Sequence, residues 1–176
     1  MKDFQFGPAQ DGETIVHGAQ RPGYSARSVG PEPVREWIEF MARNRIRRVC
    51  CLLPPEQLVY YHPTDLLEEY RRSFGAANVC CAPIRDYHLC QQALLDTVVM
   101  PFLIASDEAS LPVVVHCSGG SGRTGHVLAS FLARCRGLSV DDAIAAVART
   151  GRNPREAVQC GKATEDTLEQ LLMGRH

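Results

Sequence analysis

The chain has 176 residues, the size of one ordinary domain, and its 45% hydrophobic and 22% charged residues are typical of a soluble globular protein. The net charge of −1 excludes a strong overall attraction to nucleic acid or to an anionic membrane. The first residues lack the apolar core of a signal peptide, and no apolar run is long enough to span a membrane. We therefore expect a cytoplasmic protein that neither inserts into membranes nor requires nucleic acid.

Hydrophobic periodicity divides the chain into strands and helices within a single domain spanning residues 1–176. Residues 1–12 show no such pattern and are expected to form a loose N-terminal arm. Pro101 is expected to bend or interrupt the helix that contains it, because proline has no N–H group to donate. In chain order, the predicted elements are a strand over 14–17, a helix over 33–44, a strand over 48–53, a helix over 63–74, a strand over 78–82, a helix over 91–105, a strand over 111–116, and helices over 123–136, 139–149 and 164–173.

Strands that alternate with helices predict an α/β fold, in which a central, mostly parallel sheet is flanked by helices on both faces. Ligands bind such sheets at the carboxyl ends of the strands. The segment LPVVVH over residues 111–116 has the strongest strand pattern of the chain. The residues that follow it are therefore the first place to expect a site.

The eight cysteines are expected to be free thiols, most of them buried. Cys50 and Cys51, like Cys80 and Cys81, are neighbours in apolar runs, and neighbours on a strand point to opposite faces of the sheet. The sequence has no CxxC pair and no His/Cys cluster with the spacing of a zinc site. We therefore predict neither a disulfide framework nor a metal centre.

A loop of small residues follows the strand over 111–116 and leads into a helix. Its glycines and serines allow backbone N–H groups to turn inward and form a concave nest for an anion. The N-terminus of the following helix adds its dipole at the same point. This pattern predicts a site for a phosphate-sized oxyanion, formed by Cys117, Ser118, Gly119, Gly120, Ser121, Gly122 and Arg123.

A nucleotide-binding Walker A loop is a weak alternative for this segment. That motif requires glycine at position 117 and lysine at position 123, where this chain has Cys117 and Arg123. Those two residues suit another chemistry. The aligned N–H dipoles favour the nucleophilic thiolate of Cys117 over the thiol. The planar fork of Arg123 can bind two phosphoryl oxygens, and the Thr124 hydroxyl can donate a hydrogen bond to the sulfur.

The segment from His116 to Gly125, His-Cys-x-x-Gly-x-Gly-Arg-Thr-Gly, resembles the phosphate loop of the Cys-x5-Arg superfamily of protein tyrosine phosphatases and dual-specificity phosphatases. The resemblance implies the cysteine phosphatase fold and a phosphocysteine intermediate on Cys117. It also implies that His116 supports the loop through hydrogen bonds and does not act as a base. No metal or organic cofactor is implied, because sulfur, guanidinium and backbone dipoles cover the required roles.

The resemblance also implies an aspartate that acts first as general acid and then as base, on a loop about thirty residues before the cysteine. Asp86 lies 31 residues before Cys117 and directly follows the predicted strand over 78–82. We therefore assign this role to Asp86, with His88 as an alternative acid.

Arg149 and Arg152 lie where the family places an arginine-and-proline turn, and with Arg155 they are expected to form a positive rim for an anionic substrate. Relatives often place a water-orienting glutamine in this region. Gln159 is the nearest glutamine, but its spacing does not fit, so that role stays open.

The turn over residues 17–22 resembles the early turn near the active-site rim of compact dual-specificity phosphatases. No tyrosine-rich recognition loop is present, which favours a shallow, compact pocket. We expect a phosphatase acting on phosphorylated proteins, on phosphotyrosine and also on phosphoserine or phosphothreonine. The alternatives are a phosphatase of phosphoinositides, nucleotides or RNA 5′ ends, and an inactive module that only binds phosphorylated partners.

A smaller hypothesis concerns redox control. A low-pKa thiolate oxidises readily, and a nearby thiol can then trap it as a disulfide. Cys50 or Cys51, at the end of a strand expected beside that of Cys117, could supply this thiol. The alternative is that both cysteines only pack in the core.

Overall fold

A five-stranded sheet forms the centre of the protein, for which the computed structural model describes residues 3–174. The order of the strands is β1-β2-β5-β3-β4, and all neighbours are parallel except β1 and β2. This confirms the predicted α/β fold with a mostly parallel sheet. The strands are β1 (Gly7–Pro8), β2 (Val16–Ala19), β3 (Arg48–Cys51), β4 (Val79–Cys81) and β5 (Val113–His116).

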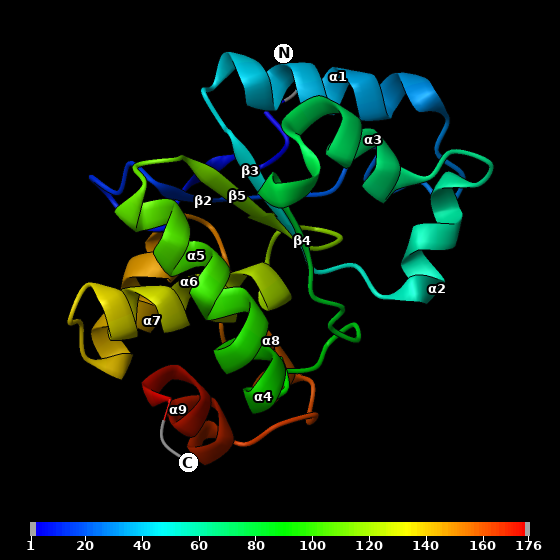
Figure 1. The fold of residues 1–176 in the computed structure, drawn as a ribbon. Helices are drawn as coiled ribbons and strands as arrows, with labels where there is room; N and C mark the ends of the chain where they lie inside the picture. Colours follow the sequence, from blue (N-terminus) through cyan, green and yellow to red (C-terminus); the bar gives the residue numbers. More distant parts are fainter. Residues whose placement is uncertain (1–2, 175–176) are drawn as a thin grey trace.

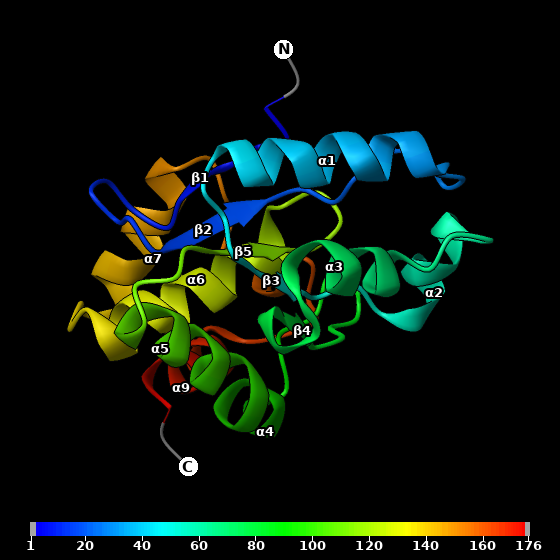
Figure 2. The same cartoon turned by 45° about the horizontal axis from the view of Figure 1, so that its top comes forward.

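Helices cover both faces of this sheet, as Figures 1 and 2 show. Helices α1 and α3 lie on one face, and α5, α6, α7 and α9 lie on the other (Figure 1). Short turns of 3-10 helix follow α2 and α3. The α-helices are α1 (Pro31–Arg43), α2 (Pro55–Leu58), α3 (Leu66–Phe74), α4 (Gln92–Leu94), α5 (Met100–Glu108), α6 (Gly122–Cys135), α7 (Val140–Arg149), α8 (Glu156–Gln159) and α9 (Glu165–Met173).

Local signals in the sequence explain where several helices begin and end. The Asp65 side chain caps α3 by accepting a hydrogen bond from the N–H of Glu68, and Gly75 ends that helix with a positive φ of 89°. Ser139 caps α7 in the same way. The helical stretch that contains Pro101 is interrupted by a π-helical turn over Leu95–Val99, which confirms the expected irregularity.

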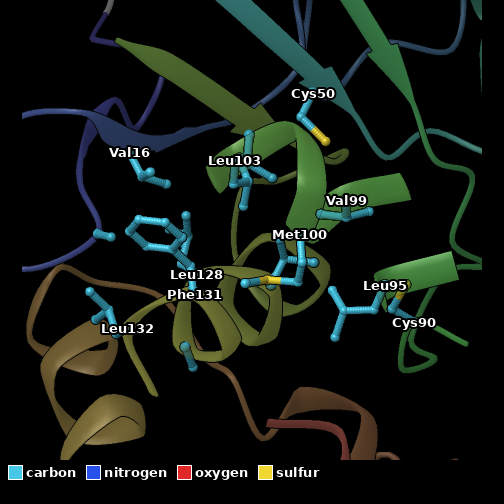
Figure 3. Close-up of a cluster of buried hydrophobic side chains, with 14 of the residues drawn as sticks. Val16, Cys50, Cys90, Leu95, Val99, Met100, Leu103, Leu128, Phe131 and Leu132 are labelled. Carbon is cyan, nitrogen blue, oxygen red and sulfur yellow. The ribbon is translucent and has the colours of Figure 1, made fainter. Parts of the chain in front are cut away.

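The central strands β3 and β5 are buried on both faces, so that successive residues of one strand enter different cores. In β5, Val113 and Val115 pack on the side of α5 and α6, whereas Val114 packs on the side of α1 and α3. Cys50 and Cys51 divide in the same way, as their adjacency predicted. Figure 3 shows the larger core, where Met100, Leu103 and Phe131 fill the space beneath the sheet.

Residues 3–12, the described part of the N-terminal segment that we expected to be a loose arm, make contacts with the rest of the domain. β1 pairs with β2, and the carbonyl of Phe4 accepts a hydrogen bond of 2.8 Å from the N–H of Gln20. The Phe4 ring is buried against Phe40 of α1. Burial of this aromatic ring fixes the arm to the domain. The periodicity of the sequence did not predict it.

Arg152 also does not form the substrate rim that we expected. Its side chain is buried and donates hydrogen bonds to the carbonyl oxygens of Gln5 (2.9 Å) and Gly18 (2.7 Å), and to the hydroxyl of Thr150 (2.7 Å). A series of closely spaced arginines in the sequence does not show which of their side chains is buried in the protein. Here the guanidinium ties the β1–β2 hairpin to the turn after α7.

We predict that Arg152→Leu destabilises the protein by about 1–3 kcal/mol, because buried carbonyl oxygens would lose their donor. Urea denaturation measures this loss. Arg149→Leu is the matched control, since Arg149 is exposed, and its change should stay within about 0.5 kcal/mol. Equal midpoints for Arg152→Leu and the wild type would contradict the structural role.

Candidate active site

The loop that connects β5 to α6 lies at the carboxyl edge of the sheet, between the segments that follow β2 and β3. His116, the last residue of β5, is in register with Ala19 of β2 and Cys51 of β3. Cys117 follows directly and is 2% exposed. The fold therefore places the predicted anion loop where parallel sheets bind ligands.

Glycines allow this loop to fit between its neighbours. Gly120 has a φ of +74°, and a Cβ at this position would lie 2.7 Å from the carbonyl oxygen of Ala19. A Cβ on Gly122 would overlap the carboxylate of Glu156. Within residues 3–174, the backbone N–H groups of residues 118–121 donate no hydrogen bond to a protein acceptor. These donors are available to an oxyanion.

Arg21 fixes the loop from the side of β2. Its backbone N–H donates to the carbonyl of Ser118 (2.9 Å), and its Nε donates to the Ser118 hydroxyl (3.1 Å). The guanidinium is buried and also donates to the carbonyl of Ala26 (2.6 Å). The turn over residues 17–22 thus reaches the site, but through an arginine that the sequence analysis did not single out.

His116 supports the loop from inside the core. Its Nδ1 lies 3.2 Å from the carbonyl oxygen of Cys117, and its Nε2 lies 3.1 Å from the hydroxyl of Tyr70. A carbonyl can only accept, so Nδ1 carries the proton and Nε2 accepts from Tyr70. Burial lowers the pKa of His116 to about 4. The imidazole is therefore neutral at physiological pH and acts as a fixed hydrogen-bonding spacer.

Arg123, Asp86 and Gln57 form one hydrogen-bonded group. Arg123 Nη2 lies 2.9 Å from Asp86 Oδ1, and Nη1 donates to Gln57 Oε1 (2.9 Å) and to the carbonyl of Ile84 (3.1 Å). The amide of Gln57 donates in turn to Asp86 Oδ2 (3.1 Å). The structure thus brings together the two predicted residues Asp86 and Arg123, and it adds Gln57, which lies on α2.

A cavity of about 300 Å³ opens above Cys117. Tyr24 and Tyr87, which are 50% and 51% exposed, lie at its rim. Arg123 is the one basic side chain among the residues that line it. The lining residues are Gln5, Tyr24, Asp86, Tyr87, Cys117, Ser118, Gly119, Ser121, Gly122, Arg123, Gly151 and Glu156.

Thr124 does not make the expected hydrogen bond to the sulfur of Cys117. Its hydroxyl is buried and has no hydrogen-bond partner within residues 3–174, so the expected bond to the Cys117 sulfur is not formed. An unsatisfied buried hydroxyl is costly and rare. Its position on the first turn of α6 leaves it free to donate to a group in or beside the loop.

Other residues assigned from the sequence lie outside the cavity. Arg149 is exposed and does not line it, and Arg155 forms ion pairs with Asp141 (3.6 Å) and Glu165 (3.1 Å). The prediction that arginines form a rim around the cavity is therefore wrong.

Gln159 is exposed and accepts a hydrogen bond from Asn153. The Nδ1 of His88 lies 2.7 Å from the backbone carbonyl of Asp86, and His88 does not line the cavity.

The thiols proposed to trap an oxidised Cys117 are poor nucleophiles in this structure. A hydrogen bond with Cys80, together with burial, raises the pKa of Cys50, and burial raises that of Cys51. Redox control through a disulfide between Cys117 and Cys50 or Cys51 therefore stays a prediction, and the geometry of the site does not favour it.

Gln57, Glu156, Arg21 and Tyr24 are the site residues that the sequence analysis missed. Gln57 follows the carboxyl end of β3, and this position was the one available signal for it. Glu156 reaches the site because the turn before α8 packs on Gly125, where a Cβ would lie 3.0 Å from the nitrogen of Pro154. Such tertiary contacts have no local signature.

No group of three or more histidine, cysteine, aspartate or glutamate side chains in residues 3–174 could hold a metal ion. Over the same residues, no helix is long and apolar enough to cross a membrane.

The family model of the DSP-PTPase phosphatase domain of Swiss Army Knife proteins (PTP-SAK) matches residues 34–167. The chain belongs to this family. As a DSP-PTPase domain, it is a phosphatase of the cysteine-dependent type, and the predicted dual-specificity-like resemblance is confirmed. No curated protein sequence matches it.

Solved structures agree with this assignment. Tk-PTP in its active form is 25% identical, with a TM-score of 0.65, over 89% of this chain and 92% of that one. Kinase associated phosphatase is 19% identical (TM-score 0.68, covering 92% and 88%), and PTPMT1 in complex with PI(5)P is 14% identical (TM-score 0.68, covering 96% and 94%). At these lower identities, the last two show that the DSP-PTPase domain shares their fold.

His126 connects the loop after β4 to α6 of this DSP-PTPase domain. Its Nε2 accepts a hydrogen bond of 3.0 Å from the N–H of Cys90, four residues after Asp86, while the ring also bonds to the backbone of Gly122. Burial, aided by the charge of Arg123, lowers the pKa of His126 to about 4. A proton on Nε2 would replace the acceptor that Cys90 requires.

We predict that acid destabilises the protein through His116 and His126. Their folded-state pKa values lie near 4, below the value of about 6.5 in unfolded chains, so the unfolded state binds more protons between these values. The free energy of unfolding should therefore fall as the pH drops from 6.5 to 4, by up to about 1.4 kcal/mol per pH unit for each histidine. Urea denaturation at pH 7, 6 and 5 measures the slope. His126→Gln should flatten it, and an unchanged slope would refute the assignment.

Proposed function

We propose that this cysteine phosphatase hydrolyses phosphate monoesters on proteins, primarily phosphotyrosine and also phosphoserine and phosphothreonine. The observation that carries the proposal is that Cys117, Arg123 and Asp86 line one small cavity. A relative that only bound phosphorylated partners would be expected to lack at least one of the three. The same set can open a phosphate ester in two steps.

In the first step, the Cys117 thiolate attacks phosphorus and the ester oxygen leaves. The N–H groups of residues 118–121 and the guanidinium of Arg123 bind the phosphoryl oxygens, where charge redistributes in the transition state. Asp86 gives its proton to the departing oxygen. The hydroxyl of Thr124 stabilises the sulfur, which is the acceptor that this buried donor lacks within residues 3–174.

The ion pair between Asp86 and Arg123 links substrate binding to the acid. A phosphate dianion competes with Asp86 for the same guanidinium, so substrate binding can release the Asp86 carboxyl from Arg123 and leave it facing the departing oxygen. Gln57 bonds to both side chains and keeps Asp86 beside the loop during this exchange.

The cavity wall supports an aryl ester carrying one phosphate. Tyr24 lies over the loop, where a Cβ on Gly119 would be 3.3 Å from its hydroxyl, and Tyr87 follows Asp86. Two rings at the rim can pack against the ring of phosphotyrosine. Within residues 3–174, Arg123 is the only basic side chain that lines the cavity, so a substrate with several phosphates would lack partners for the others. This weighs against phosphoinositides that carry several phosphomonoesters, but not against one with a single such group, and PTPMT1 has been solved with PI(5)P.

Hydrolysis of p-nitrophenyl phosphate tests the catalytic assignment. We expect activity in the wild type with inhibition by vanadate, no activity in Cys117→Ser, and a loss of ~10²-fold or more in kcat for Asp86→Asn, which lacks the general acid. Gln159→Ala, an exposed change outside the cavity, should keep wild-type activity. Activity that persists in Cys117→Ser would exclude the cysteine mechanism.

The substrate class is tested by comparing phosphotyrosine and phosphoserine peptides with PI(5)P in the wild type and in Tyr24→Ala and Tyr87→Ala. We expect the highest kcat/KM on phosphotyrosine. Each variant should lower this value by about 2–10-fold, in proportion to one lost ring contact. The phosphoserine peptide is the control and should lose less. Preference for PI(5)P, or equal losses on both peptides, would contradict an aryl-binding wall.

A further inference from the structure

Glu156 is a second carboxylate in the cavity above Cys117. It is the first residue of α8, and its carboxylate rests on Gly122 at the start of α6, where only a glycine leaves room for it. The side chain is half-buried and makes no hydrogen bond or ion pair with any residue in the described range 3–174. It therefore offers unused acceptor oxygens at the site.

The carboxylate of Asp86 is in a different situation. Its Oδ1 is bound by Arg123 Nη2 (2.9 Å) and by the backbone N–H of Tyr87 (3.2 Å), and its Oδ2 is bound by the amide of Gln57 (3.1 Å). These contacts hold the acid near the leaving oxygen. They also leave Asp86 with fewer free acceptor sites than Glu156 for binding a second reactant.

Hydrolysis of a phosphocysteine requires a group that binds a water molecule and accepts its proton. Gln159, the nearest glutamine in sequence, is exposed and bonded to Asn153 outside the cavity. Of the residues that line the cavity, Glu156 and Asp86 are the two carboxylates, and Glu156 is the one without a bonded partner in residues 3–174.

We propose that Glu156 is the catalytic base of the second half-reaction, an inference that rests on the proposed function. Glu156 binds a water molecule and takes one of its protons while the water oxygen attacks phosphorus. The P–O bond forms as the P–S bond breaks, and the electron pair of that bond returns to Cys117 as thiolate. The proton leaves Glu156 to solvent after phosphate departs, and Asp86 regains its own proton from solvent.

The electrostatic surroundings suit this role. Burial raises the pKa of Glu156, the negative charge of Asp86 raises it further, and Arg123 opposes both. A carboxylate with a raised pKa is a stronger base than an ordinary exposed glutamate. The role of Asp86 as acid and the role of Glu156 as base are separated in time. Asp86 has already given up its proton when the water molecule arrives.

Pre-steady-state kinetics with p-nitrophenyl phosphate separate the two half-reactions in Glu156→Gln, a variant of nearly the same shape. We expect the release of about one equivalent of nitrophenol in a rapid burst, followed by turnover with a kcat lowered by ~10²-fold, because the phosphocysteine accumulates. Acid quenching after the burst should trap that intermediate on Cys117. Glu156→Asp, which keeps a base, should regain part of the lost kcat.

Gln159→Ala is the matched control and should show wild-type kinetics, and thermal melting verifies that each variant is folded. An unchanged kcat in Glu156→Gln, or a burst slowed to the same extent as turnover, would overturn the assignment while leaving the proposed function intact. Failure of the proposed function itself has another signature, namely hydrolysis without any phosphoenzyme in the wild type.

Discussion

The guanidinium of Arg123 is the contact on which the geometry of the site depends. Arg123 lies in the first turn of α6, after β5, and it binds Asp86 and Ile84 after β4 and Gln57 after β3. A charge that is only 2% exposed needs such partners, because an unpaired buried charge is very costly. Arg123 therefore holds the surrounding loops together, and a ligand bound to its guanidinium would change the contact that positions Asp86.

The opposite wall of the loop is held by hydrogen bonds and by packing against the protein core. Arg21 binds Ser118, His116 bridges the Cys117 carbonyl and Tyr70, and Gly120 lies directly on the end of β2. The contacts of His116 and Gly120 are made by buried atoms in a closely packed core, and the bond between Arg21 and Ser118 is partly buried. The loop is thus shaped before an anion enters, which is the condition under which fixed dipoles stabilise a transition state most.

The sequence predicted the parts of this molecule whose causes are local. Strand and helix positions follow from apolar periodicity, and Cys117 and Arg123 follow from a motif of closely spaced residues. Asp86 follows from the family resemblance, which implies an aspartate at this distance before the cysteine and after a strand. Gln57 and Glu156 could not be found in this way, since tertiary packing alone brings α2 and α8 to the loop. Arg152 was misread for the same reason, because its burial is determined by carbonyl groups more than 130 positions away.

The charges in the cavity limit what can bind there. One guanidinium and two carboxylates line the cavity, so the positive field available to a phosphate comes also from the backbone dipoles of the loop and from the buried Arg152, whose charge interacts with Cys117. Those dipoles converge on a single point and can neutralise one phosphoryl group. A second phosphate on the same substrate would lie farther out, toward Asp86 and Glu156, where like charges repel it. We therefore expect the two carboxylates that exchange protons in the proposed mechanism to favour substrates with one phosphate as well.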